Sequence, residues 1–172
     1  QWSSSAASDV YKRQSDNNVV SLFEQTNQGV QKAVLTDSMK MKRGGSLSNP
    51  IVAYETWGKL SKQKDNVVVI LTGLSASSHV ASHSNNSKPG WWEGIVGPDK
   101  AIDTNKFYVI CVNSLGSCFG STGPASINQI TGEPFRLTFP ELTIDDMATA
   151  TKLLLDKLNI KQINTLVGPS LG

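Results

Sequence analysis

The sequence predicts an α/β fold in which the strands of a mostly parallel sheet alternate with a helical segment and short loops. Three short apolar runs rich in β-branched residues lie between turn-forming residues, at Val67–Leu71, 107–112 and 163–167. Such continuous apolar runs are typical of strands buried on both faces of a parallel sheet. An earlier run, Ile51–Trp57, combines β-branched and aromatic residues and ends at Gly58, which also favours a strand.

A helix is predicted between the second and third of these parallel strands. Thr143 and Asp146 have the spacing of a capping box, and Asp145 adds negative charge to the first turn. Asn159 is suited to a left-handed residue that ends the helix. The apolar positions after the cap fit one helix face: Ile144, Met147, Ala148, Leu154, Leu155 and Leu158.

Composition excludes several classes of protein. The 172 residues carry a formal charge of +2 without a run of Lys or Arg, so no nucleic-acid-binding surface is indicated. No apolar run approaches the roughly 18 residues of a membrane span, and no secretory signal is visible. Two cysteines are too few for a disulfide scaffold, so we expect free thiols in a reducing cytoplasm. Cys111 is expected to be structural, and Cys118 lies in a Gly/Ser loop.

The domain is predicted to occupy residues 39–172. Residues 1–38 are expected to form a disordered leader, because they are polar and show little hydrophobic periodicity. Residues 1–14 are rich in Ser and Ala and share no pattern with the rest of the chain, so we expect them to be non-native.

The motif Gly168-Pro169-Ser170-Leu171-Gly172 comes directly after the last apolar run. It has the G-x-S-x-G form of a nucleophile elbow, a sharp turn that exposes a serine at the end of a strand. Small residues are required two positions before and after the serine because backbone segments meet there. The preceding helix, loop and strand favour this interpretation over an ordinary Gly/Pro turn. Ser170 is therefore the predicted nucleophile, and the amide of Leu171 is a predicted oxyanion donor.

A second oxyanion donor is expected in the loop after Val67–Leu71. This loop, residues 72–78, contains Gly73, and the amide of Leu74 is the predicted donor, although a plain βα turn is the alternative. Leu74 should then lie near Ser170, with its N within about 8 Å of Oγ, since both donors must reach one oxyanion.

Two histidines have a spacing that suits other roles. His79 and His83 could share a helix face as metal ligands, but the sequence shows no third ligand, so no metal is predicted. Both precede Ser170, whereas a fold with a nucleophile elbow orders its triad Ser, Asp/Glu, His. We therefore expect them to be loop or core residues. The Gly/Ser stretch 116–123 lacks the Lys-Ser/Thr pair of a phosphate-binding loop.

A series of longer segments runs in order through residues 39–172. They read MKRGGSL, VAYETWGKL, LTGLSASSHVAS, PGWWEGIVGPDKAIDT, FYVICVNSLGSCFGSTGPASIN, TGEPFRLTFPELTIDDM and VGPSLG. Together they resemble the homoserine O-acetyltransferase family. The stretches MKRGG, TGLS and VNSLGSC are most similar to the branch that succinylates serine.

The resemblance implies an α/β-hydrolase fold whose sheet ends, in this chain, at the nucleophile elbow. It implies transfer of an acyl group from acyl-coenzyme A to the hydroxyl of homoserine or serine, in methionine or cysteine biosynthesis. The family's catalytic Asp and His lie downstream of the serine, so the chain is expected to be an N-terminal part. Two departures leave donor and acceptor open: 71–76 reads LTGLSA where many members have C-H-A-L-S/T-G, and 168–170 reads GPS where many have GGS.

The implied mechanism is ping-pong through an acyl-serine at Ser170. Trp91, Trp92 and the loop 113–123 are candidates for the pocket, with simple packing as the alternative for the tryptophans. Arg43 and Arg136 are candidates for binding a substrate carboxylate or a coenzyme A phosphate, with surface solvation as the alternative.

The expected partners are small-molecule substrates, acetyl- or succinyl-coenzyme A with homoserine or serine. We expect no bound cofactor, nucleic acid or membrane, and a homodimer stays open for the full-length protein. The competing functions are an esterase or thioesterase, which would share the elbow, and an inactive fragment.

Overall fold

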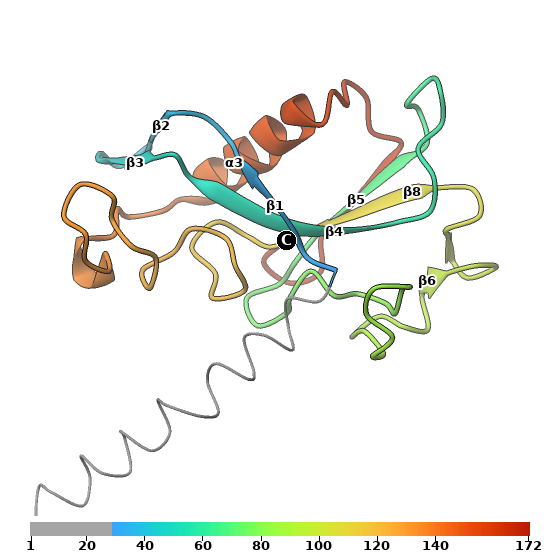
Figure 1. Cartoon of the computed structure of the whole chain (residues 1–172). Coiled ribbons are helices and arrows are strands. Elements are labelled where there is room, and N and C mark those ends of the chain that lie inside the picture. Colours follow the sequence, from blue (N-terminus) through green and yellow to red (C-terminus); the bar gives the residue numbers. More distant parts are fainter. Residues whose placement is uncertain (1–28) are drawn as a thin grey trace, which may run out of the picture.

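The computed structural model describes residues 29–172, whose centre is a five-stranded sheet (Figure 1). Along the sheet the strands are β1 (Gln31–Val34), β4 (Ile51–Trp57), β8 (Tyr108–Val112), β5 (Val67–Leu71) and β9 (Thr165–Val167). The predicted α/β class is confirmed. The predicted leader segment 1–14 lies outside the described residues.

The sheet is mixed, with a parallel part that contains the elbow strand. β5 pairs in parallel with β8 on one side and with β9 on the other. β1 pairs with β4, and β4 with β8, in antiparallel fashion. The predicted strand at 107–112 is confirmed as β8, and the one at 163–167 is observed as the shorter β9. The continuously apolar runs therefore pair in parallel, while β1 and β4 extend the sheet by antiparallel pairing.

Strand β1 corrects the predicted start of the folded region. It lies within the range 1–38 that was expected to be a leader, yet it pairs along its length with β4. Its sequence QKAV has no apolar pattern that would predict a strand, because three of its four residues are exposed at the edge of the sheet. Leu35, the next residue, is buried in the core, so the segment is held by packing as well as by the ladder.

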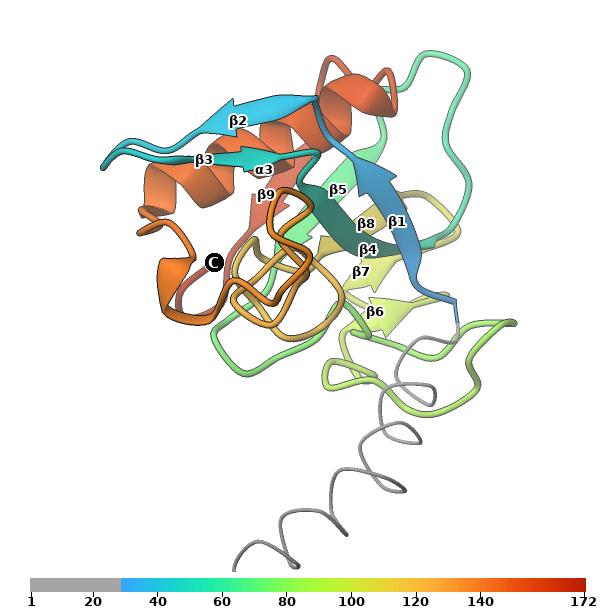
Figure 2. The same cartoon turned by 60° about the vertical axis from the view of Figure 1, so that its left-hand side comes forward.

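A β-hairpin comes after β1 and packs over the helix side of the sheet (Figure 2). It consists of β2 (Ser38–Lys40) and β3 (Ser46–Ser48), paired antiparallel. In each strand the central residue is buried, Met39 in one and Leu47 in the other, and its neighbours are exposed. This alternation gives the hairpin one apolar face, which joins the main core.

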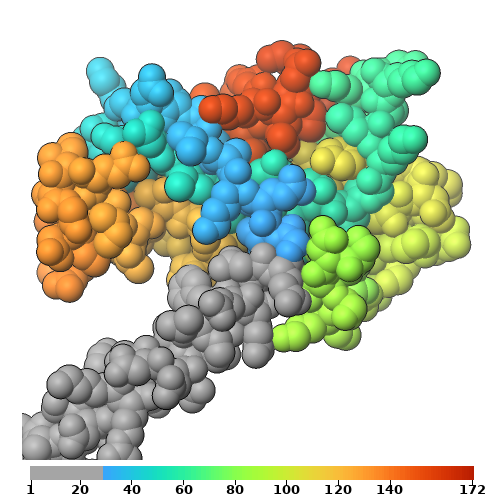
Figure 3. Space-filling model, in the orientation of Figure 1, coloured from blue at the N-terminus to red at the C-terminus, as the bar shows by residue number. Residues whose placement is uncertain are grey.

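The predicted helix is observed as α3 (Ile144–Lys157), with the expected capping box between Thr143 and Asp146. Asn159 lies just beyond it with a φ of +55°, as expected for a left-handed stop. The helix covers one face of the sheet (Figure 1), where Ala150 and Leu154 are buried. A short 3-10 turn, η1 (Arg136–Thr138), precedes it in the long segment between β8 and α3. In Figure 3 the orange part of this segment forms one end of the molecule.

Strand β5 is buried on both faces, as its sequence predicted. Val67 and Val69 join the cluster under α3, while Val68 and Ile70 join a second cluster on the opposite face. The short parallel pair β6 (Val96–Gly97) and β7 (Ile102–Asp103), labelled in Figure 2, lies on that second side, where Val96 is buried in the cluster and Ile102 packs against it. Cys111 is fully buried there, and its burial raises the pKa of the thiol, which agrees with a structural role. None of the helices within residues 29–172 has the length and apolarity needed to cross a membrane.

The buried carboxylate of Asp146 joins the helix cap to the β2–β3 turn. Its Oδ2 accepts from Thr143 N at 2.8 Å and from Thr143 Oγ1 at 2.7 Å, and its Oδ1 accepts from Lys42 N at 3.0 Å. Burial alone would raise the pKa of this carboxyl, but the hydrogen bonds from Thr143 and Lys42 outweigh it and lower the pKa.

Replacement of Asp146 by Ala is expected to destabilise the protein by about 2 kcal/mol, because it removes the cap and leaves two backbone donors unpaired. Urea unfolding measures the loss. The pKa of Asp146 is lower in the folded state than in the unfolded state. Its carboxylate therefore adds to the free energy of unfolding above the unfolded-state pKa of about 3.9, and this addition is lost as the pH falls through the folded-state pKa. The exposed neighbour Asp145→Ala is the control. Equal stability of the two variants at neutral pH would contradict the assignment.

Candidate active site

The candidate nucleophile Ser170 lies in a strained turn at the end of β9. Its φ is +60°, a conformation that is uncommon for a residue with a side chain and is concentrated at functional sites. Gly172 N donates to Pro169 O at 3.1 Å and closes the turn around the serine. Ser170 and Leu171 are exposed at its tip. This is the geometry of a nucleophile elbow, so the motif is more than an ordinary Gly/Pro turn.

Both motif glycines are required by close backbone contacts. A Cβ on Gly168 would lie 2.2 Å from the carbonyl carbon of Gly172, and one on Gly172 would lie 2.3 Å from Leu71 O. No real Cβ tolerates such distances, so the turn folds back on itself and against the end of β5. The expectation that small residues are needed two positions either side of the serine is confirmed.

The loop after β5 reaches the serine. A Cβ built on Gly73 would lie 3.2 Å from Ser170 Cβ and 3.7 Å from Ser170 Oγ. Leu74 is the next residue; it is 82% exposed and lines the same cavity as Leu171. The two segments predicted to supply oxyanion donors therefore meet beside Ser170. Donation by the amides of Leu74 and Leu171 stays a prediction.

A cavity of about 230 Å³ opens beside the elbow. The loop 72–74, the loop after β8, the segment before α3 and the helix itself contribute to its wall. The side chains that line it are mostly apolar: Leu74, Leu115, Phe139, Leu142, Met147 and Leu171, with Ser114 and Ser117 among the polar ones. The loop 113–123 was expected to help build a pocket, and its residues Ser114, Leu115, Gly116 and Ser117 do line this cavity.

The other candidate binding residues lie elsewhere. Arg43 forms an exposed ion pair with Glu141, and Arg136 is exposed at the start of η1; neither lines the cavity. Their role toward a substrate stays a prediction. Trp91 donates from Nε1 to Ser77 O at 2.8 Å, and its ring packs 4.8 Å from that of Trp92. Trp92 packs against the second core cluster, so the tryptophans support the loops rather than line the cavity.

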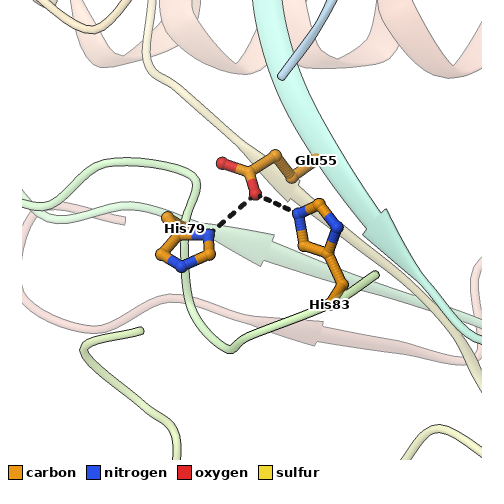
Figure 4. A group of neighbouring side chains, drawn as sticks. All are labelled: Glu55, His79 and His83. Atoms are coloured by element: carbon orange, nitrogen blue, oxygen red, sulfur yellow. Dashed lines mark hydrogen bonds and ion pairs between the residues drawn. The ribbon is translucent and has the colours of Figure 1, made fainter. Parts of the chain in front are cut away.

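The two histidines flank a buried carboxylate that sequence reasoning did not single out. Glu55 is fully buried in β4, and its Oε2 lies 2.9 Å from His79 Nδ1 and 2.9 Å from His83 Nε2 (Figure 4). The three facing atoms lie within 4.8 Å of one another, so a third potential ligand, which the sequence did not show, is present in space. Both histidines are partly buried loop residues, as expected. A charged residue inside an otherwise apolar strand was the signal that could have identified Glu55.

Comparison with known proteins agrees with this geometry. The family model described as alpha/beta hydrolase fold matches residues 66–172. A serine O-succinyltransferase of Xanthomonas campestris pv. campestris (strain B100) is 54% identical over 138 residues, which are 80% of this chain and 36% of that protein. One from Frateuria aurantia is 56% identical over 139 residues, 80% of this chain and 38% of that protein. The chain thus spans less than two fifths of these relatives.

Solved structures show the same similarity. The homoserine O-acetyltransferase from Bacillus anthracis superposes with a TM-score of 0.76 at 33% identity, covering 83% of this chain and 40% of that one. Esterase E22 superposes with a TM-score of 0.75 at 39% identity, covering 83% and 41%. The resemblance first seen in the sequence motifs is therefore confirmed. With its elbow, its sheet and the matched family model, the chain belongs to the α/β-hydrolase fold family.

Proposed function

We propose that the protein containing this chain is an acyl-coenzyme A-dependent O-acyltransferase that acylates the side-chain hydroxyl of serine or homoserine. The observation that supports it most directly is the strained turn at Ser170 with Gly73 packed against it. An exposed serine beside a second loop is suited to nucleophilic attack and to stabilisation of the resulting oxyanion. Similarity to proteins named serine O-succinyltransferase favours serine as acceptor and succinyl as the acyl group.

The proposed reaction begins with attack by Ser170 Oγ on the thioester carbonyl, while a histidine C-terminal to this chain takes the proton. The amides of Leu171 and Leu74 hold the tetrahedral oxyanion, and loss of one such donor typically costs about 3–4 kcal/mol of barrier. Collapse of the intermediate breaks the C–S bond and releases coenzyme A, protonated by the same histidine. The acceptor hydroxyl then gives its proton to the histidine and attacks the acyl-serine carbonyl. The ester bond to Oγ breaks, and the histidine returns the proton to Ser170 Oγ.

Transfer rather than hydrolysis requires that the acyl-serine be kept from water while the acceptor is held in place. The apolar side chains around the cavity are suited to this exclusion. We place the reaction in cytoplasmic methionine or cysteine biosynthesis, with acyl-coenzyme A as substrate and no bound cofactor. The proposal includes acetyl and succinyl as the transferred group, so both donors belong in any test of the reaction.

An esterase is the second candidate, because esterase E22 is 39% identical over most of this chain. It would use the same elbow and would pass the acyl group to water. Release of acyl-serine or acyl-homoserine when acceptor is added distinguishes the two functions.

The proposed reaction predicts that Ser170 carries the acyl group between two half-reactions. Mixing the complete protein with acetyl- or succinyl-coenzyme A, without acceptor, should add one acyl mass that maps to Ser170, and Ser170→Ala should abolish it. Intact-protein and peptide mass spectrometry provide the measurement. Ser84→Ala, at an exposed loop position, is the control. A wild-type protein that transfers the acyl group to the acceptor but never gains the acyl mass would contradict the covalent mechanism.

A further prediction concerns the loop beside the serine. Gly73→Ala should lower kcat by about tenfold. The new methyl group would lie 3.2 Å from Ser170 Cβ and would displace either the loop or the elbow. A misplacement of about 1 Å in an active site can lower the rate by up to about 100-fold. Steady-state kinetics of acyl transfer test this. The matched control is Gly94→Ala, where an added Cβ meets nothing within 4 Å. If both variants retain wild-type kcat, the loop does not take part in the site.

A further inference from the structure

Glu55 is a buried charge that the proposed reaction does not use. Its carboxylate lies beneath the loop after β5, where it has no access to solvent. Removing a carboxylate from water is costly unless hydrogen bonds or opposite charge compensate it. Oε1 accepts from Ser78 Oγ at 3.0 Å, and Oε2 faces His79 Nδ1 and His83 Nε2. All of these partners come from one loop, so the carboxylate fastens that loop to β4.

The network continues from Ser78 into the loop after β8. Ser78 N donates to Asn113 Oδ1 at 2.6 Å, and Asn113 Nδ2 donates to Ser78 Oγ at 3.1 Å. The same Nδ2 also donates to Phe119 O at 2.8 Å. Ser78 and Asn113 are both buried, which makes these hydrogen bonds costly to leave unmade. A single buried network therefore joins β4, the loop after β5 and the loop after β8.

The placement of protons indicates a hydrogen-bonded network rather than a metal site. His79 Nε2 lies 2.7 Å from Lys88 O and Nδ1 lies 2.9 Å from Glu55 Oε2. Because a carbonyl and a carboxylate only accept, both ring nitrogens donate, and neither has a lone pair for a metal ion. Asn85 N donates to His83 Nδ1 at 3.3 Å, which assigns the proton of His83 to Nε2. That Nε2–H then donates to Glu55 and has no lone pair for a metal ion.

We infer that Glu55 is a positioning residue for the acyl-transfer site, an inference that rests on the proposed function. The two loops that it joins both border the cavity beside Ser170: Leu74 comes from one, and Ser114 and Ser117 come from the other. Glu55 does not line this cavity, so it acts through the loops and not on the substrate. It sets the distance between the predicted oxyanion amide of Leu74 and the opposite wall of the cavity.

Glu55→Gln is the most informative substitution because Gln has almost the same shape as Glu. Its amide has one accepting oxygen and one donating nitrogen. With the nitrogen toward the histidines, it faces the Nε2–H of His83, so two donors meet. With the nitrogen toward Ser78, it cannot accept the hydroxyl proton that Oε1 of Glu55 accepts, so the Ser78 hydroxyl loses its acceptor. Neither orientation reproduces the network, so both loops should loosen while the core retains its volume.

The experiment compares Glu55→Gln with Glu133→Gln, the same change at an exposed carboxylate, in the complete protein. We measure kcat and KM for acyl transfer, thermal unfolding, and amide hydrogen exchange. For Glu55→Gln we expect kcat to fall by about 100-fold with little change in KM, since a misplacement of about 1 Å has this effect. Exchange should become faster in residues 72–83 and 113–120 but not in α3. A purely structural role would instead lower the unfolding temperature and speed exchange throughout.

A second variant keeps the test decisive if Glu55→Gln does not fold. Ser78→Ala removes the hydroxyl that connects Glu55 to Asn113, while the backbone N of residue 78 still donates to Asn113 and the carboxylate still faces both histidines. It should show the same pattern to a smaller extent. Unchanged kcat and exchange in either folded variant would overturn the inference while leaving the proposed function intact. A tightly bound divalent metal in the wild-type protein, lost in Glu55→Gln, would also overturn it. If the wild-type protein transfers no acyl group, the proposed function fails, and the exchange data alone decide whether Glu55 positions the loops.

Discussion

The structure around the candidate site depends on the parallel pairing of β5 with both of its neighbours. Because β8, β5 and β9 run in the same direction, their carboxyl ends meet at one edge of the sheet. The loops that leave them carry Ser114, Leu74 and Ser170, which come from distant parts of the sequence. The register pairs Ile70 with Val167, and this brings the backbone of Gly172 against Leu71 O. That contact is where the elbow is fixed to the sheet.

Two kinds of force maintain this arrangement. Apolar residues of β5 are buried on both faces, and such burial contributes roughly 25 cal/mol for each Å² removed from water. This force is non-directional, so it holds the sheet together without fixing the loops. Hydrogen bonds to buried carboxylates fix the loops instead, because these bonds are directional. Asp146 holds the cap of α3 to the β2–β3 turn, and Glu55 holds the loop after β5 to β4. Each charge has several donors, which makes its position specific.

The strands and helix were predictable where a local pattern carried the signal. The apolar run of β5, the capping box at Thr143 and the stop at Asn159 each depend on neighbouring residues, and all were confirmed. Ser170 was identified because its motif came directly after a strand. Strand β1 was missed, since its short, exposed sequence becomes a strand only by pairing with β4.

The surroundings of the site could be predicted only in part. Glu55 and His79 are far apart in the sequence, and their contact depends on how the loop after β5 folds over β4. Arg43 was a candidate because its charge suits a carboxylate, but its partner Glu141 could not be seen without the fold. Long-range polar contacts of this kind have no periodicity to reveal them.

The proposed function requires that Ser170 lie between two backbone amides, one from the elbow and one from the loop after β5. A crystal structure of the complete protein with a phosphonate on Ser170 tests it most directly, since a phosphonate oxygen occupies the position of the oxyanion. The account predicts that this oxygen lies about 3 Å from both Leu171 N and Leu74 N. An oxygen held by other donors, with Leu74 N well beyond hydrogen-bond reach, would contradict it.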